Sequence, residues 1–163
     1  MLLVAAVIGI RIYQEKKSAV PSAKNFYENL QTDAISKIEI IKAGKILSLV
    51  KENDKWLEMT SETEKSAADA EAIKTLLDKA KNIKVAAAVT DKTDKQELFQ
   101  VTSAGLEVIF YQGEQKLADF YIGKTTPDFN GNYLRKDGEN QIYSTTERIS
   151  SYFSKSTFVK KSE

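Results

Sequence analysis

Carboxylates, amides, lysines and tyrosines are the side chains through which this chain could do chemistry, because its 163 residues include neither cysteine nor histidine. Their absence excludes disulfides, thiolate nucleophiles, Cys/His zinc sites and histidine-dependent triads. Most enzyme classes are therefore disfavoured at the outset.

Four oxygen-bearing residues repeat the ligand spacing of a calcium-binding loop. Asp128, Asn130 and Asn132 stand at positions one, three and five, and Glu139 stands at position twelve. Position six needs glycine for a sharp turn and is Tyr133 instead. Because Asp, Asn and Gly are also common in ordinary turns, we interpret the stretch as a turn and keep calcium binding as the alternative.

A second group of carboxylates, Asp91, Asp94 and Glu97, lies within one short polar segment. A pair of carboxylates can act as general acid and base. Lys92 and Lys95 alternate with these acids, however, which is typical of a solvated loop. We favour the solvated loop over catalysis.

The tripeptide from Gly123 to Thr125 resembles the end of a phosphate-binding loop. That motif needs a further glycine five places earlier, where this chain has Ala118. The residues between them have the composition of a strand. We therefore interpret Gly123 as a glycine at the end of a strand.

Many of the aromatic residues fall at strand spacing, where they usually form sheet core and cross-strand pairs. A ligand or peptide groove lined by them is the alternative. The residues concerned are Phe110, Tyr111, Phe120, Tyr121, Phe129, Tyr133 and Tyr143.

One amphipathic helix is the clearest element that could position these groups. Apolar residues recur at three-and-four spacing from Ala67 to Ile83, which predicts a helix with one buried stripe. Ser66 followed by Asp69 predicts a capping box at its start. A short strand carrying Trp56, the only tryptophan, precedes it.

Alternating segments around this helix predict an α+β domain. It has a mainly antiparallel sheet, with the central helix and a C-terminal helix packed on it. The C-terminal helix runs through Ile149 and Phe153 and is capped by Thr145 or Thr146. A helical turn over 96–101 should bury Leu98 and Phe99. The predicted strands are 35–41, 46–51, one around Trp56, an interior strand 85–89, 105–111, 116–122, 133–135 and 141–144.

The first ten residues, Met1 to Ile10, are uninterrupted apolar. A helix of that length covers about 15 Å, whereas the hydrocarbon core of a bilayer is about 30 Å thick. We favour the trailing part of a membrane helix, and a secretory signal or a core helix are the alternatives. Arg11, Lys16 and Lys17 follow as typical interfacial anchors, although the positive-inside rule by itself favours a cytoplasmic domain after them.

We expect four parts along the chain. A membrane-anchor segment covers 1–17, a linker 18–34, the α+β domain 35–153 and a flexible tail 154–163. The linker prediction depends on Pro21, which blocks helix continuation.

The charges nearly balance, with 24 Lys and Arg against 23 Asp and Glu, and the net charge is +1. Such a chain has no broad positive field for nucleic acid. We therefore expect no nucleic-acid partner.

Several segments in order resemble the domain of unknown function 4340 family of bacterial membrane-anchored proteins. They are the strand 35–40, the Trp56 strand, the helix 68–84, the segment 120–124 and the segment 131–143. The resemblance implies a single-pass N-terminal membrane helix and a domain outside the cytoplasm. Some relatives are linked to ABC-type transport or gliding motility, and no catalytic residues are implied.

From these observations we expect a non-catalytic, membrane-anchored extracytoplasmic interaction module, an accessory of a transport or envelope complex. Its partners would be the membrane, through the N-terminal helix, and a protein of the cell envelope. We expect no catalytic residue, cofactor or metal. The alternatives are a carboxylate-dependent hydrolase of envelope polymers and a small-ligand or calcium-binding module.

Overall fold

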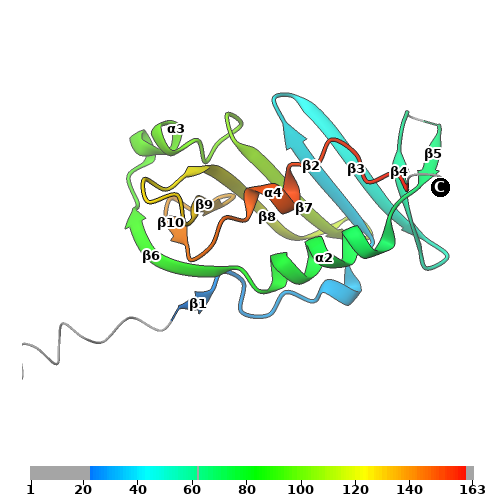
Figure 1. Ribbon diagram of the computed structural model, residues 1–163, viewed down its shortest axis with the longest axis horizontal. Coiled ribbons are helices and arrows are strands. Elements are labelled where there is room, and N and C mark those ends of the chain that lie inside the picture. The colour runs from blue at the N-terminus through cyan, green and yellow to red at the C-terminus, as the bar shows by residue number, and fades with distance from the viewer. Residues whose placement is uncertain (1–22, 62, 161–163) are drawn as a thin grey trace, which may run out of the picture.

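The computed structural model describes residues 23–61 and 63–160. Within this part of the chain the strands form one ten-stranded antiparallel sheet, and helices α2 and α4 lie on the same face of it (Figure 1). The predicted α+β class, with a mainly antiparallel sheet, is confirmed.

The strands are β1 (Lys24–Asn25), β2 (Lys37–Lys42), β3 (Lys45–Glu52), β4 (Lys55–Met59), β5 (Lys65–Ala67), β6 (Lys84–Thr90), β7 (Leu106–Gln112), β8 (Gln115–Thr125), β9 (Asn132–Lys136) and β10 (Ile142–Thr145). The α-helices are α2 (Ala70–Lys81), α3 (Gln96–Phe99) and α4 (Ser150–Phe153), and the short 3-10 helices are η1 (Thr32–Ala34) and η2 (Thr93–Lys95).

Two four-stranded meanders meet where β2 pairs with β7, and the order of their eight strands is symmetric about this pair. One meander runs outward from β2 through β3 and β4 to β5, and the other from β7 through β8 and β9 to β10. The segment after each meander crosses to the other meander. Strand β6, which follows α2, pairs with β10, and Val159, which follows α4, forms a bridge with Ala68 just after β5. The two halves therefore hold each other together through exchanged segments.

Helix α2 begins one residue after Asp69, whose carboxylate accepts hydrogen bonds from the backbone N–H groups of Glu71 and Ala72. The prediction that Ser66 takes part in the cap is wrong, because Ser66 lies in β5 and pairs with Glu58. Asp69 satisfies two of the N–H groups that a helix start leaves without partners.

The core lies between the sheet and helices α2 and α4. The predicted stripe of α2 faces it, with Ile73, Leu76 and Ala80 buried. From the sheet and α4, the fully buried side chains include Ile38, Leu49, Phe110, Phe120, Leu134 and Phe153. Phe120 contacts Phe110 and Phe153 edge-to-face, with ring centroids 5.9 and 6.0 Å apart.

Strand β6 does not lie inside the core as predicted. Ala86, Ala87, Ala88 and Val89 are exposed, because the helices cover the middle of the sheet and β6 runs beyond them towards one end (Figure 1). A short run of small apolar residues has the same pattern in an interior strand and in a strand near an edge.

The helical turn predicted over 96–101 exists as α3, but neither Leu98 nor Phe99 is fully buried as predicted. Leu98 is 55% exposed, whereas Phe99 packs on Tyr133 with ring centroids 4.4 Å apart. The C-terminal helix is α4, and its start is capped neither by Thr145 nor by Thr146.

Two segments predicted to be linker and tail contribute to the folded core. Phe26 and Leu30 are buried, and the backbone N–H of Phe26 donates to the carbonyl of Ile83. Phe158 is also buried, and its carbonyl accepts from the backbone N–H of Asp69. Phe158 stands in a mostly polar segment, so the sequence did not indicate that it is buried.

Residues 1–17, where we predict the membrane anchor, lie outside the described residues. Among residues 23–61 and 63–160, the structure has no helix of the length and apolarity needed to cross a bilayer.

Candidate functional site

The four residues with calcium-loop spacing do not converge on one point. The side-chain amide of Asn130 donates to Asp128, and Asp128 also accepts from the hydroxyl of Thr126, as in an ordinary turn. Glu139 forms an ion pair with Lys136, on the next hairpin.

Asn132, the fifth position of that spacing, has a structural role that the sequence did not indicate. It is buried, and its side-chain oxygen accepts the backbone N–H groups of Ile149 and Ser150 at 2.9 and 3.1 Å. Its side-chain amide donates to the carbonyl of Gly123. Asn132 therefore caps α4 from strand β9, and its oxygen is used by these two N–H groups.

The carboxylates Asp91, Asp94 and Glu97 lie on the exposed surface around η2 and α3. Asp94 pairs with Lys95, and Glu97 accepts a hydrogen bond from the hydroxyl of Thr102. In the part of the chain that the structure describes, no three acidic side chains are grouped so that they could hold a metal ion.

Gly123 lies within β8, so the strand interpretation is confirmed, although the strand continues to Thr125 and does not end at this glycine as predicted. A Cβ at this position would stand 2.1 Å from the carbonyl oxygen of Phe99. Glycine is therefore required by the close approach of the loop after α3, and the resemblance to a phosphate-binding loop has this structural explanation.

The aromatic residues at strand spacing divide between the two faces of the sheet. Phe110 and Phe120 belong to the core under the helices, whereas Tyr111 and Tyr121 lie half-buried on the opposite face. The hydroxyl of Tyr111 donates to Glu39 at 2.9 Å, and that of Tyr121 donates to Glu107 at 3.1 Å.

These two cross-strand pairs have opposite electrostatics. Burial raises the pKa of Glu39, but hydrogen bonds from Lys37 and Tyr111 outweigh it, and the pKa lies below its ordinary value. Burial, with the charges of Asp119 and Asp137 beside it, holds the pKa of Glu107 above its ordinary value.

Arg135 extends the second pair into a buried network. Its guanidinium lies 4.6 Å from the ring centroid of Tyr121 and donates to the main-chain carbonyls of Val101, Lys136 and Glu139. Burial, then the charge of Glu107, raises the pKa of Tyr121 to about 12. The arrangement fixes strands and turns to one another and leaves the tyrosine protonated at neutral pH.

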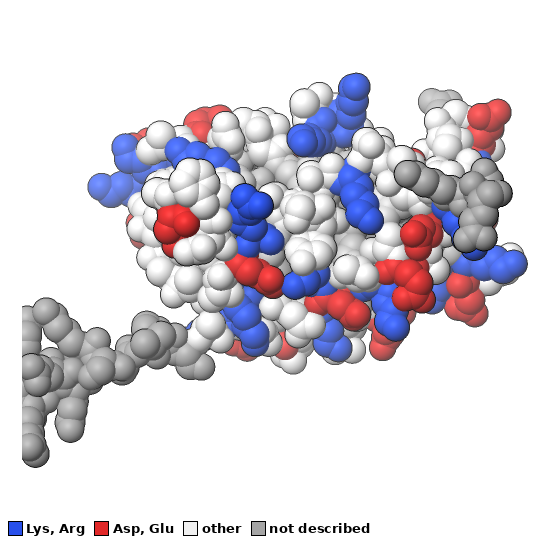
Figure 2. Space-filling model, viewed as in Figure 1, with Lys and Arg blue, Asp and Glu red and all other residues white. Residues whose placement is uncertain are grey.

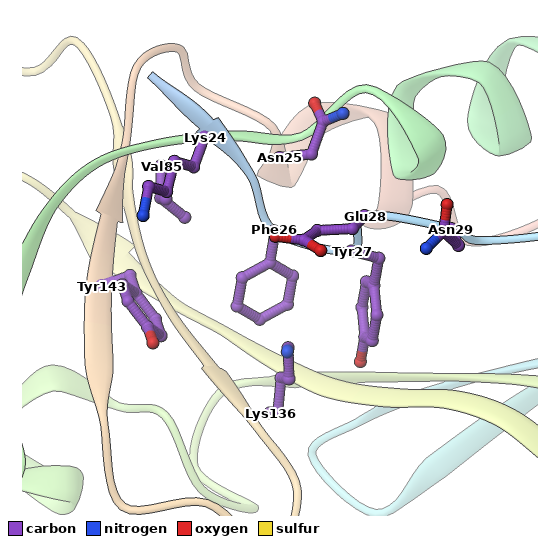
Figure 3. A pocket seen from close by; sticks show the side chains of 9 residues that line it. All are labelled: Lys24, Asn25, Phe26, Tyr27, Glu28, Asn29, Val85, Lys136 and Tyr143. Carbon is purple, nitrogen blue, oxygen red and sulfur yellow. The ribbon is translucent and has the colours of Figure 1, made fainter. Parts of the chain in front are cut away.

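A hollow of about 450 Å³ lies beside β1, where the described chain enters the domain (Figure 3). The rings of Phe26 and Tyr27 lie side by side and point towards Lys136, whose ammonium is 5.4 and 5.1 Å from their centroids. Both rings also pack on Phe120, with ring centroids 5.9 Å apart in each pair. This hollow therefore lies at the interface where the N-terminal segment packs on the sheet.

A second hollow, of about 390 Å³, lies between the end of the β2–β3 hairpin and the residues after α4. Among its apolar lining residues, Ile40, Leu106 and Phe153 are buried and Leu47 is half-buried. We call it the lysine groove, and its remaining lining residues are Lys42, Lys45, Ile46, Ser154, Lys155 and Ser156.

The lysine groove is the strongest candidate for a binding site in the described residues. Phe153 and Leu106 are buried beneath it, whereas Ile46 is 63% exposed at its rim. In Figure 2 the charged atoms visible over the end of the β2–β3 hairpin and the segment just after α4 are blue.

The walls of this groove are far apart along the chain, so no single stretch of the sequence indicates it. One local signal was present: Lys42 and Lys45 flank the Ala43-Gly44 turn, and Ile46 follows directly. A hairpin tip with two lysines and an apolar side chain combines cationic and apolar contacts in one short stretch.

The folded domain, in which α2 lies between β5 and β6, is similar in sequence to a known protein family. The sequence model of the family described as Domain of unknown function (DUF4340) matches residues 58–162, which is more than half of the chain. The chain belongs to this family. The match begins within β4 and includes α2, the second meander and α4, so it confirms the resemblance seen in the sequence. Neither the curated proteins nor the solved structures gave a match to the chain.

Proposed function

We propose that this chain is a non-catalytic interaction module, held at a membrane by its N-terminal segment, with the folded domain outside the cytoplasm. The observation that carries the anchoring is the uninterrupted apolar run from Met1 to Ile10, followed by Arg11, Lys16 and Lys17. Its role would be that of an accessory to a transport or envelope complex.

The geometry of the described domain supports attachment at its N-terminal side. Strand β1 lies at one edge of the sheet, and the β2–β3 hairpin lies at the opposite side of the view from the point where the chain enters (Figure 1). Phe26, packed on Phe120 and Tyr27, fastens the entering segment to the core. A domain held in this way presents the hairpin away from its attachment.

The polar residues that were candidates for chemistry are used to build the fold. Asn132 caps α4, Asp128 closes a turn, and Glu97 binds Thr102. These three side chains are engaged in hydrogen bonds within the fold, and none of them lines the lysine groove. Their use in the fold supports an interaction role over a catalytic one.

The test is fractionation of cells that express the full chain. We expect it in the membrane pellet after a high-pH carbonate wash and in the soluble fraction after detergent treatment. A matched variant carries Leu3→Lys and Val7→Lys in the apolar run and should be lost from the pellet. Recovery of the unaltered chain in the soluble fraction without detergent would overturn the anchoring.

A further inference from the structure

We propose that the lysine groove binds an acidic, amphipathic segment of a partner protein. This inference rests on the proposed function, since it names the chemistry of the partner that an interaction module would bind. The occupant would place apolar side chains against Ile46 and Leu47 and its carboxylates beside Lys42, Lys45 and Lys155.

Charge complementarity points to an acidic occupant. Lys51, Lys65 and Lys79 each have a carboxylate within 4 Å, at 3.3, 2.5 and 3.1 Å. Among the described residues, none of the three groove lysines has such a partner. Three cations around one hollow repel each other, and carboxylates brought between them remove that repulsion.

The groove is also built to accept apolar side chains. Phe153 and Ile40 are buried at its base and belong to the main core, so the base is rigid. Lys155 is positioned by the ring of Phe158, 5.2 Å from its ammonium, and the exposed Ser154 and Ser156 add hydroxyl donors on the same wall. An apolar base with a few polar groups at the rim is typical of peptide-binding grooves.

The N-terminal part of this chain does not have the required charge. Its apolar run is followed by Arg11, Lys16 and Lys17, with Glu15 as the acidic residue among them. A basic segment beside three lysines would be repelled.

A hollow favours a peptide over a bilayer surface. The half-buried Leu47 lines the hollow together with the lysines, where a flat layer of headgroups fits less well than a projecting side chain. Side chains that project from a peptide can enter the groove and contact Leu47 and Ile46.

The experiment measures binding to the purified full chain, held in nanodiscs of neutral phosphatidylcholine if fractionation shows it to be membrane-bound. The probe is a fluorescent synthetic peptide of alternating leucine and glutamate. Its comparison peptide has lysine in place of glutamate. Fluorescence anisotropy gives the affinity, and amide chemical shifts locate the site.

We expect the glutamate peptide to bind and to shift the amides of residues 40–47 and 153–156, while the lysine peptide does not bind. Lys45→Glu with Lys155→Glu should weaken binding about tenfold or more. The matched control, Lys55→Glu with Lys81→Glu, makes the same change of charge at exposed lysines outside the groove and should leave binding unchanged.

Three results would overturn the inference: no binding of the glutamate peptide, equal weakening by the control variant, or binding of phosphatidylglycerol vesicles in preference to the peptide. Each leaves the anchoring to be judged by fractionation. Conversely, a chain that is soluble in cells but binds the peptide through the groove would refute the anchoring and retain the groove.

Discussion

The side-chain oxygen of Asn132 lies 2.9 Å from the backbone nitrogen of Ile149, so the first residue of β9 caps the start of α4. The same oxygen accepts from Ser150, and the amide of Asn132 donates to Gly123. One buried side chain thereby joins β8, β9 and α4.

Replacing Asn132 by alanine should therefore destabilise the fold. Removal of a helix cap costs about 0.5–2 kcal/mol, and the N–H groups of Ile149 and Ser150 would also be left without their partner. We expect a total loss of about 1–3 kcal/mol in urea unfolding. The amides of Ile149 and Ser150 should also exchange faster with solvent in Asn132→Ala; unchanged exchange at both amides would contradict the capping role.

The buried stripe of α2 predicts a large effect of Leu76→Ala. Leu76 is 1% exposed, and truncation of a buried leucine to alanine costs about 2–5 kcal/mol. Thermal or urea unfolding measures the loss. Lys74→Ala, on the exposed side of the same helix, should change the stability little. A loss below about 1 kcal/mol for Leu76→Ala would show that the stripe is not core.

Glu58 holds the C-terminal segment to the sheet. This buried carboxylate accepts the backbone N–H of Phe158 and the hydroxyl of Thr157, at 2.5 and 2.9 Å. Hydrogen bonds to a charged group contribute about 1.5–3 kcal/mol, so Glu58→Ala should lower the stability by about that amount. Hydrogen exchange at the amide of Phe158 should also speed up.

Glu58→Gln provides the matched control for this prediction, because the amide oxygen still accepts hydrogen bonds. It should protect the Phe158 amide better than alanine does. If Phe158 exchanges at the same rate in the unaltered chain and in Glu58→Ala, the segment is not held by this contact.

The two tyrosine–carboxylate pairs predict opposite dependences on pH. The pKa of Glu39 is lowered in the folded state, so its contribution to stability is present above the ordinary glutamate pKa and is lost as the pH falls through the folded value. The pKa of Glu107 is raised, so ionisation of Glu107 opposes folding as the pH rises.

Urea unfolding at about pH 3 and pH 6 tests this contrast, because these values lie on either side of the ordinary glutamate pKa of about 4.3. Glu39→Gln should be more destabilising at the higher pH than at the lower. The free energy of unfolding of Glu107→Gln, relative to that of the unaltered chain, should increase as the pH rises. The same sign of change for both variants would contradict the assigned shifts.

The sequence predicted the α+β class and the buried face of α2, because both follow from local periodicity. Ile73, Leu76 and Ala80 fall on one stripe whatever surrounds the helix. The hairpins also followed from local signals: Gly138, with φ 74°, stands at the turn between β9 and β10, as the Asp137-Gly138 pair predicted.

The missed features depend on contacts between distant residues. Nothing near Asn132 indicates that it caps a helix beginning at Ser150, and nothing near Phe158 indicates the contact with Glu58. The lysine groove joins Lys45 and Lys155 across more than half of the chain, so no window of sequence contains it. Local patterns predict elements, whereas these sites require the assembled sheet.

The central claim, a domain anchored at a membrane and facing outside the cytoplasm, has one direct measurement. Because the natural chain has no cysteine, the variant Lys81→Cys introduces a single thiol at the exposed end of α2. A maleimide that does not cross membranes is added to cells whose outer envelope has been permeabilised while the cytoplasmic membrane stays intact, and separately to lysed cells. We predict labelling of the membrane-bound chain before lysis. Labelling only after lysis would place the domain in the cytoplasm and contradict the account.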